Sequence, residues 1–312
     1  MKKTAFLFPG QGSQAVGMGQ DLYEKYESVK ERFAMAEKIT GIGLKELCFN
    51  GPMADLTMTV NLQPAVTLIN LACLHLLNKE GIIPAISAGH SLGEYSALCA
   101  AGIVSEEDAM RLVYKRGELM HREAEKHKGA MSAIIGISIA EVREIVEQAK
   151  SEGTVSVANH NAEKQIVITG SPEAVKKAGE LAAAKKAKAI PLKVSGAWHS
   201  ELIRGAEAEF KSFVQEMPFH APKSKVIHNV NADAVSSHDA IKDIMVAQLC
   251  SPVRWYDSVL KMMAEKVEIF AEVGPGKVLT GLVKKIIPKD YACEVHNVFD
   301  LPSLEAFLKA VK

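Results

Sequence analysis

The segment Gly89–Gly93, with the sequence GHSLG, carries residue types that could do covalent chemistry. It fits the pattern G-x-S-x-G, in which a sharp turn between a strand and a helix exposes a serine hydroxyl. Residues 82–88 are typical of a short buried strand, and residues 94–101 of a helix that ends at a glycine. Free N–H groups at the start of that helix would stabilise an oxyanion. Ser91 is therefore a candidate nucleophile; the alternative is a surface turn with an incidental serine.

A serine nucleophile needs a neighbouring general base, and His199 is the best placed of the ten histidines. It lies at a junction that follows the last strand of a predicted insert, where active-site loops are common. His90 adjoins Ser91, but neighbouring side chains at a sharp turn point apart. His160, in a predicted loop, is a weaker rival.

The interval between Ser91 and His199 offers no obvious acid for a complete triad. Its single aspartate, Asp108, fits the start of a helix that Ser105 would cap. The glutamates of this interval mostly fall on predicted helix surfaces. The sequence therefore predicts a Ser-His pair that is oriented by a backbone carbonyl or an amide.

Arg116 interrupts the apolar face of a helix predicted over residues 106–124. Apolar residues flank it at helical spacing, and a buried charge costs several kcal/mol unless it is paired. One interpretation is that its head group reaches solvent or pairs with an internal glutamate. The other is that the guanidinium binds a substrate carboxylate through two parallel hydrogen bonds. In that case the acyl group would be a half-thioester of a dicarboxylic acid.

The composition is that of an ordinary globular enzyme: 312 residues, 48% hydrophobic and 24% charged, with a formal net charge of zero. No overall charge favours nucleic acid or a membrane surface. The first apolar run ends at Pro9, which predicts a strand rather than a signal peptide, and we expect no apolar stretch near the length of a membrane span. Five scattered cysteines without metal-ligand spacing predict reduced thiols, no metal site and a cytoplasmic setting.

The predicted strands and helices of residues 127–197 follow a different order from the α/β pattern on either side. Strands and helices alternate there in the order β-α-β-β-α-β, with a polar loop between the second and third strands, which is a ferredoxin-like unit. We therefore expect an α/β protein with a small subdomain at 127–197 inserted into a larger one formed by 1–126 and 198–312. Lysines cluster at the second helix of the insert, as a solvated face or as a docking patch for an acidic partner: Lys176, Lys177, Lys185, Lys186 and Lys188.

Six ordered segments carry a resemblance that covers residues 4–300. They are FPGQGSQ (8–14), GHSLGE (89–94), KRG (115–117), SGAWHS (195–200), QLCSPVR (248–254) and EVGPG (272–276). In this order they resemble the malonyl-CoA:acyl carrier protein transacylases of type II fatty acid synthesis, which are related to the acyltransferase domains of polyketide synthases.

The resemblance implies an α/β-hydrolase-like core with a ferredoxin-like insert and a ping-pong Ser-His mechanism. It implies that Ser91 is the nucleophile, His199 the base and Arg116 the ligand of the malonyl carboxylate. The backbone N–H groups of Gln11 and Leu92 would form the oxyanion hole. The main-chain carbonyl of Gln248 would orient His199.

The resemblance further implies transfer of malonyl from malonyl-CoA to the phosphopantetheine thiol of acyl carrier protein, without a metal or other cofactor, by a monomer. Asn159 and Gln165 would help to shape the site. Two departures from the family pattern concern Trp198, where phenylalanine is usual, and the missing proline of the 159–165 segment. The alternatives are a free-standing polyketide synthase acyltransferase, a serine thioesterase or hydrolase, and a non-catalytic module that binds carrier protein.

Overall fold

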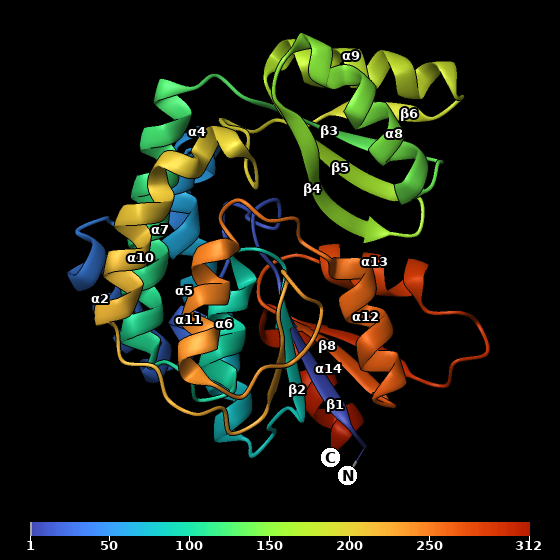
Figure 1. Ribbon diagram of the computed structural model, residues 1–312. Coiled ribbons are helices and arrows are strands. Elements are labelled where there is room, and N and C mark those ends of the chain that lie inside the picture. Colours follow the sequence, from blue (N-terminus) through green and yellow to red (C-terminus); the bar gives the residue numbers. More distant parts are fainter. Residues whose placement is uncertain (1) are drawn as a thin grey trace.

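A five-stranded parallel sheet forms the centre of the computed structural model, which describes residues 2–312 (Figure 1). Its strand order is β7-β2-β1-β8-β9, and every neighbouring pair is parallel. The strands are β1 (Thr4–Phe8), β2 (Ile86–Gly89), β7 (Lys225–Ile227), β8 (Ile269–Val273) and β9 (Glu294–Val298). Because β1 is central and covered on both faces, it is an almost unbroken apolar run.

Helices cover both faces of this sheet, and β1 shows how the apolar residues divide between them. Phe6 and Phe8 belong to one apolar cluster, whereas Ala5 and Leu7 belong to another. The first cluster includes residues of α2 (Glu27–Thr40), α5 (Thr59–Lys79), α6 (Gly93–Ala100), α7 (Glu106–Lys126), α10 (Glu207–Glu216), α11 (His238–Ala247) and α14 (Leu301–Val311). The second includes residues of α12 (Trp255–Ala264) and α13 (Val278–Ile286). Shorter helices are α1 (Gln20–Lys25), α3 (Leu44–Asn50), α4 (Met53–Thr57) and the 3₁₀ turns at Lys150–Glu152 and Glu201–Ala206.

Helix α5 corrects one expectation from the sequence. We expected no apolar stretch near the length of a membrane span, yet this 21-residue helix is long and apolar enough to cross one. In the fold, 83% of its most apolar window is buried. It packs between α2, α6 and α7 and is a core helix.

The second sheet has four antiparallel strands in the order β4-β5-β3-β6 and lies apart from the first (Figure 1). Its elements follow the predicted β-α-β-β-α-β order: β3 (Ala130–Ile135), α8 (Ile139–Ala149), β4 (Val155–Ala162), β5 (Gln165–Gly170), α9 (Pro172–Ala184) and β6 (Lys188–Pro191). The two helices pack with the strands around an apolar cluster of their own.

Strand β4 is longer than the sequence suggested, because residues 159–162 continue it instead of forming a loop. They pair with β5 through two irregular steps in register. On the other side, the N–H of His160 donates to the carbonyl of Val253 at 2.9 Å, and the N–H of Val253 donates to Ala158 at 2.8 Å. These backbone bonds outweigh the low strand propensity of the asparagines, and they tie the antiparallel sheet to the segment that leads into α12.

Candidate active site

The turn Gly89–Gly93 joins the carboxyl end of β2 to the start of α6. Ser91 has a φ of 51°, a left-handed conformation that is strained for a serine. The two glycines make the turn possible, because a Cβ on Gly93 would lie 1.9 Å from the carbonyl oxygen of Phe8. A Cβ on Gly89 would lie equally close to Gly93. The structure therefore has the strained strand-turn-helix geometry that the G-x-S-x-G spacing predicts.

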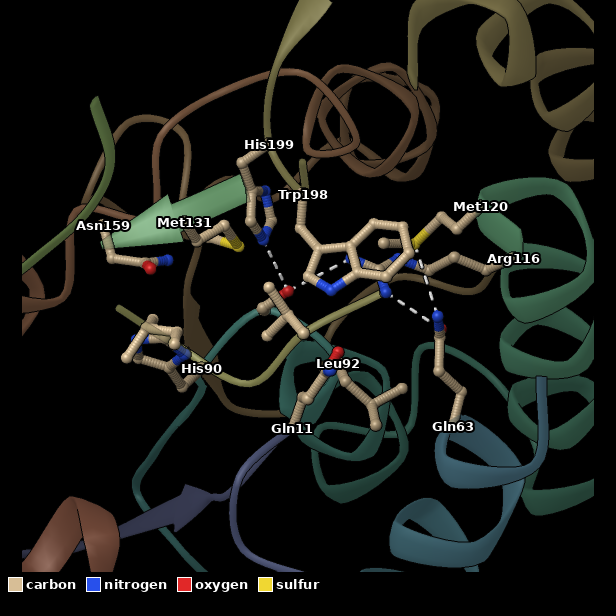
Figure 2. Close-up of a pocket in the computed structure, with 13 residues that line it drawn as sticks. Gln11, Gln63, His90, Leu92, Arg116, Met120, Met131, Asn159, Trp198 and His199 are labelled. Carbon is tan, nitrogen blue, oxygen red and sulfur yellow. Dashed lines mark hydrogen bonds between the residues drawn. The ribbon is translucent and has the colours of Figure 1, made fainter. Parts of the chain in front are cut away.

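Ser91 and His199 are in direct contact. The Ser91 Oγ lies 2.7 Å from Nε2 of His199 (Figure 2). Nδ1 of His199 lies 2.9 Å from the main-chain oxygen of Gln248. Gln248 ends α11, where carbonyl groups have no partner within the helix. With Nδ1–H donating to that carbonyl, Nε2 is left to accept the serine proton. His199 also has a positive φ, of 61°, so both members of the pair are strained.

The environment of His199 keeps the imidazole in the neutral form, which is the form that a general base needs before it accepts a proton. His199 is 3% exposed, and burial, followed by the nearby Arg116 cation, lowers its pKa from 6.5 to about 3. The imidazole is therefore neutral at pH 7, with Nε2 free to take a proton.

Arg116 is buried, at 2% exposed, and among residues 2–312 its guanidinium hydrogen-bonds neutral oxygens only and lies over the ring of Tyr95. Nη1 donates to Oε1 of Gln63 at 2.9 Å, and Nη2 donates to the Ser91 Oγ at 3.1 Å (Figure 2). Nη2 also donates to Oε1 of Gln248 at 3.2 Å. A pairing with an internal glutamate is thus absent from this part of the chain, and the cation lies beside the nucleophile without a direct counter-ion.

Two backbone donors lie beside Ser91, on Gln11 and Leu92 (Figure 2). Within residues 2–312, neither N–H donates a hydrogen bond. The N–H of Ser91 itself is occupied, because it donates to Oδ1 of Asn229 at 2.7 Å. The two free N–H groups line the cavity that contains the Ser91 hydroxyl, an arrangement that can bind an oxyanion.

The cavity is lined by residues of the turn after β2, of helices α5 and α7, of strands β3 and β4 and of the loops that follow β1 and β6. Its lining comprises Gln11, Gln63, His90, Ser91, Leu92, Arg116, Met120, Met131, Asn159, Leu192, Val194, Trp198 and His199. Asn159 and Trp198 are thus brought to the site, where the buried indole and Arg116 line the same cavity (Figure 2). Gln165 is not brought to this cavity: it begins β5, and its Oε1 accepts from Nζ of Lys285 at 3.1 Å.

The rival histidines make other contacts. Nε2 of His90 lies 2.8 Å from Oδ1 of Asn161, and its ring packs near Trp255. The ring of His160 packs against Tyr256. Neither histidine hydrogen-bonds Ser91 within the described chain, so His199 is the one that is positioned as a base.

Reasoning from the sequence missed a buried polar layer beneath the turn. Glu94 is an exception to the expectation that most of the glutamates between Ser91 and His199 lie on helix surfaces, because it is fully buried in the first turn of α6. Gln63 was also missed, although a polar residue within an apolar helix was a usable signal. Nothing local marked Asn229, since its contact is with a turn 138 residues away.

Two other expectations concern surface and metal sites. Lys185 of the lysine cluster pairs with the exposed Glu144 at 3.0 Å, as on a solvated face. No group of three or more His, Cys, Asp or Glu side chains comes together as a metal site between residues 2 and 312.

A strained serine, a neutral histidine and two free N–H groups in one cavity are the groups that a serine-dependent acyl-transfer site requires. Comparison with known proteins agrees with this class. The model of the acyl transferase domain family matches residues 5–299. Malonyl CoA-acyl carrier protein transacylase of Bacillus subtilis (strain 168) is 45% identical over 288 residues, which are 92% of this chain and 91% of that protein.

Solved structures give the same result over nearly the whole length. An acyl carrier protein S-malonyltransferase from Vibrio cholerae has a TM-score of 0.92 at 42% identity, covering 98% of this chain and 99% of that one. A malonyl-transacylase in complex with its type II PKS acyl-carrier protein has a TM-score of 0.94 at 36% identity, covering 99% of each chain. The chain therefore belongs to the acyl transferase family, among the malonyl CoA-acyl carrier protein transacylases.

Proposed function

We propose that this protein transfers the malonyl group from malonyl-CoA to the phosphopantetheine thiol of acyl carrier protein. The observation that carries the proposal is the buried Arg116, whose guanidinium touches the nucleophilic hydroxyl. In a malonyl group on Ser91, a single methylene separates the carboxylate from the ester carbonyl, so a cation beside the Oγ can reach that carboxylate. Guanidinium binds carboxylate in a planar fork, which selects this acyl group over one without a charge.

In the first half-reaction, Nε2 of His199 takes the proton of Ser91 as its Oγ attacks the malonyl thioester. The negative charge that develops on the carbonyl oxygen is stabilised by the N–H groups of Gln11 and Leu92. The carbon–sulfur bond then breaks, and CoA leaves as a thiol with the proton from His199. The product is malonyl-Ser91.

In the second half-reaction, His199 deprotonates the phosphopantetheine thiol of the carrier protein. The thiolate attacks the ester carbonyl of malonyl-Ser91, and the same N–H groups stabilise the second oxyanion. The bond between the carbonyl carbon and the Ser91 Oγ then breaks, which releases the malonyl thioester of the carrier protein, and the Ser91 oxygen regains its proton from His199. The carbonyl of Gln248 keeps the imidazole in the required tautomer in both steps. Protein groups carry out every proton transfer in this scheme.

We further propose that the parallel sheet and its helices form an α/β-hydrolase-like core of residues 1–126 and 198–312. Residues 127–197 would form an inserted ferredoxin-like subdomain, a proposal supported by their strand order β4-β5-β3-β6 and separate apolar cluster. A monomer in the cytoplasm is the setting we infer. The five cysteines, which are free thiols, agree with a reducing compartment.

The test is incubation with malonyl-CoA followed by intact-mass measurement, for the wild type, Ser91→Ala and Arg116→Ala. We expect a malonyl adduct on the wild type, none on Ser91→Ala and much less on Arg116→Ala. Transfer to holo-acyl carrier protein should then exceed the release of free malonate. Steady release of malonate without transfer would overturn the proposal in favour of the hydrolase alternative.

The pathway served is a separate question, since fatty acid and polyketide systems use the same transfer. One solved relative is bound to a type II PKS acyl-carrier protein, which keeps the free-standing polyketide acyltransferase as a second candidate. Comparing kcat/KM for a carrier of each type would distinguish the two.

A further inference from the structure

The carboxylate of Glu94 is buried beneath Ser91 and hydrogen-bonds neutral groups. Oε2 accepts from Nε2 of Gln248 at 2.6 Å and from the main-chain N–H of Asn229 at 3.2 Å. Oε1 lies 2.8 Å from Nδ1 of His228. Glu94 and His228 are both fully buried, so neither charge nor hydrogen bond is screened by solvent.

His228 is best described as neutral in this pair. A charged imidazolium would have a second N–H at Nε2, and in the described chain that buried nitrogen has no partner. Burying an unpaired, charged donor is costly, whereas a neutral ring that donates from Nδ1 has no proton on Nε2 and so no donor there to satisfy. The pair therefore keeps the negative charge of Glu94.

The Gln248 side chain connects this anion to the buried cation of the active site. Its Oε1 accepts from Nη2 of Arg116 at 3.2 Å, while its Nε2 donates to Glu94 and, at 3.0 Å, to the main-chain oxygen of Ser91. One amide group thus lies between a guanidinium and a carboxylate that do not touch each other.

We propose that Glu94 is the counter-charge of Arg116 in the empty site and acts on it through the amide of Gln248. When malonyl-CoA binds, the same negative charge lowers the affinity of Arg116 for the substrate carboxylate. The inference rests on the proposed function, in which Arg116 binds that carboxylate. Glu94 is a positioning residue, because it acts through Gln248 and touches no substrate atom.

The indirect pairing has two consequences. A carboxylate in direct contact with Arg116 would compete with the substrate for the same donors. With an amide between them, the anion offsets the buried cation in the empty site and leaves the cavity side of the guanidinium free for the substrate. The second consequence is electrostatic. Glu94 repels the incoming malonyl carboxylate, so the carboxylate binds less tightly than it would to Arg116 without the charge of Glu94.

Glu94→Gln is a suitable test because it removes the charge and can keep the hydrogen bonds of the carboxylate. The new amide oxygen can replace Oε2, and the new NH₂ can donate to Nδ1 of His228 once that ring changes tautomer. The change places a neutral N–H at the buried Nε2 of His228, which lowers stability without adding a charge. The substitution then removes charge with little change of shape. Glu272→Gln is a matched control: Glu272 is also buried, accepts from the N–H groups of Leu279 and Thr280 in α13, and makes no contact with Arg116.

The measurement is the dissociation constant of malonyl-CoA and of acetyl-CoA by calorimetry, with all variants made on a Ser91→Ala background so that no transfer occurs. We expect Glu94→Gln to bind malonyl-CoA roughly tenfold more tightly, the size expected for two like charges about 12 Å apart at an effective dielectric constant of about 20, with the Gln248 amide and the Arg116 guanidinium between them. Acetyl-CoA binding should stay unchanged, and Glu272→Gln should alter neither constant. A merely structural role for Glu94 would weaken both ligands.

Four outcomes separate the inference from the proposed function. Tighter binding of malonyl-CoA alone supports the inference. Equal or weaker malonyl-CoA binding by Glu94→Gln, with an intact preference in the Ser91→Ala parent, overturns the inference and leaves the proposed function standing. A parent without any preference for malonyl-CoA overturns both.

The fourth outcome is a Glu94→Gln protein that does not fold, and Gln248→Glu then tests the same idea with the opposite sign. That variant keeps the main-chain carbonyl that faces His199. It also places a second carboxyl group against Glu94, where the two groups share one proton and one negative charge, and so brings that charge next to Arg116. We expect at least tenfold weaker binding of malonyl-CoA and unchanged binding of acetyl-CoA; unchanged malonyl-CoA binding would overturn the inference.

Discussion

Two buried histidines flank the Ser91 turn, and they are held by different kinds of acceptor. His199 donates from Nδ1 to a neutral carbonyl, that of Gln248, whereas His228 donates from Nδ1 to the carboxylate of Glu94. His199 presents its second nitrogen to the Ser91 hydroxyl, and the second nitrogen of His228 is buried without a partner in the described chain.

The difference shows how a site without an acid in contact with its base can still use a buried carboxylate. A charged acceptor on His199 would favour the imidazolium, while a carbonyl fixes the tautomer and leaves the pKa low. The negative charge is placed instead on the other side of the turn, against His228 and Gln248. In the proposed mechanism His199 therefore acts as the base, whereas His228 holds the buried carboxylate of Glu94 in place.

The largest expected effect separates these two assignments. His199→Ala should lower kcat/KM for malonyl transfer by roughly 10³-fold, because a general base contributes about 10²–10⁴-fold. His228→Ala should mainly lower the free energy of unfolding, by about 3 kcal/mol, since it leaves a buried carboxylate short of one donor. Transfer assays and urea unfolding of both variants check this, and an equal loss of activity in a stable His228→Ala protein would contradict the comparison.

A second effect concerns stability against pH. The pKa of His199 is about 3 in the folded state and 6.5 in its ordinary state, so the unfolded chain binds a proton as the pH falls below about 6.5 while the folded protein does not. Stability is lost in that window, by about 2 kcal/mol at pH 5 from this residue. In His199→Gln, the loss between pH 8 and pH 5 should be smaller by that amount. Identical curves for the two proteins would show that His199 titrates normally when folded.

The smallest effect sharpens the account of His199 itself. Burial lowers its pKa most and the Arg116 cation next, so Arg116→Met should raise the pKa without restoring its ordinary value. The measurement is an NMR pH titration of ¹³C-labelled histidine, with His199→Gln to assign the signal. A pKa that stays the same or falls would show that Arg116 does not act on the imidazole.

The parts of the site that the sequence predicted are those that local spacing determines. The Ser91 turn requires small residues at fixed positions, and Arg116 stands out because it falls on an apolar helix face. The buried layer was not predictable in this way, since Glu94 meets Asn229 and Gln248 across 135 and 154 residues. Glu94 lies in α6, Asn229 follows β7 and Gln248 follows α11, so these groups meet only through tertiary packing.

The same distinction applies to the fold. The order of elements in the antiparallel sheet followed from patterns of apolar residues and turns. The extension of β4 through residues 159–162 did not, because its backbone bonds to Val253 come from a distant segment. The burial of α5 likewise depends on neighbours that surround it, whereas its apolar composition alone would also fit a membrane span.

Gln248 orients His199 with its main chain and contacts Arg116, Glu94 and the Ser91 carbonyl with its side chain. A substitution at position 248 affects these two roles differently. A change of side chain removes the second set of contacts, but every amino acid supplies a carbonyl at that position. The alignment of the base is therefore protected against point mutations that leave the backbone in place, and a shift in the length of α11 is the kind of change that would remove it.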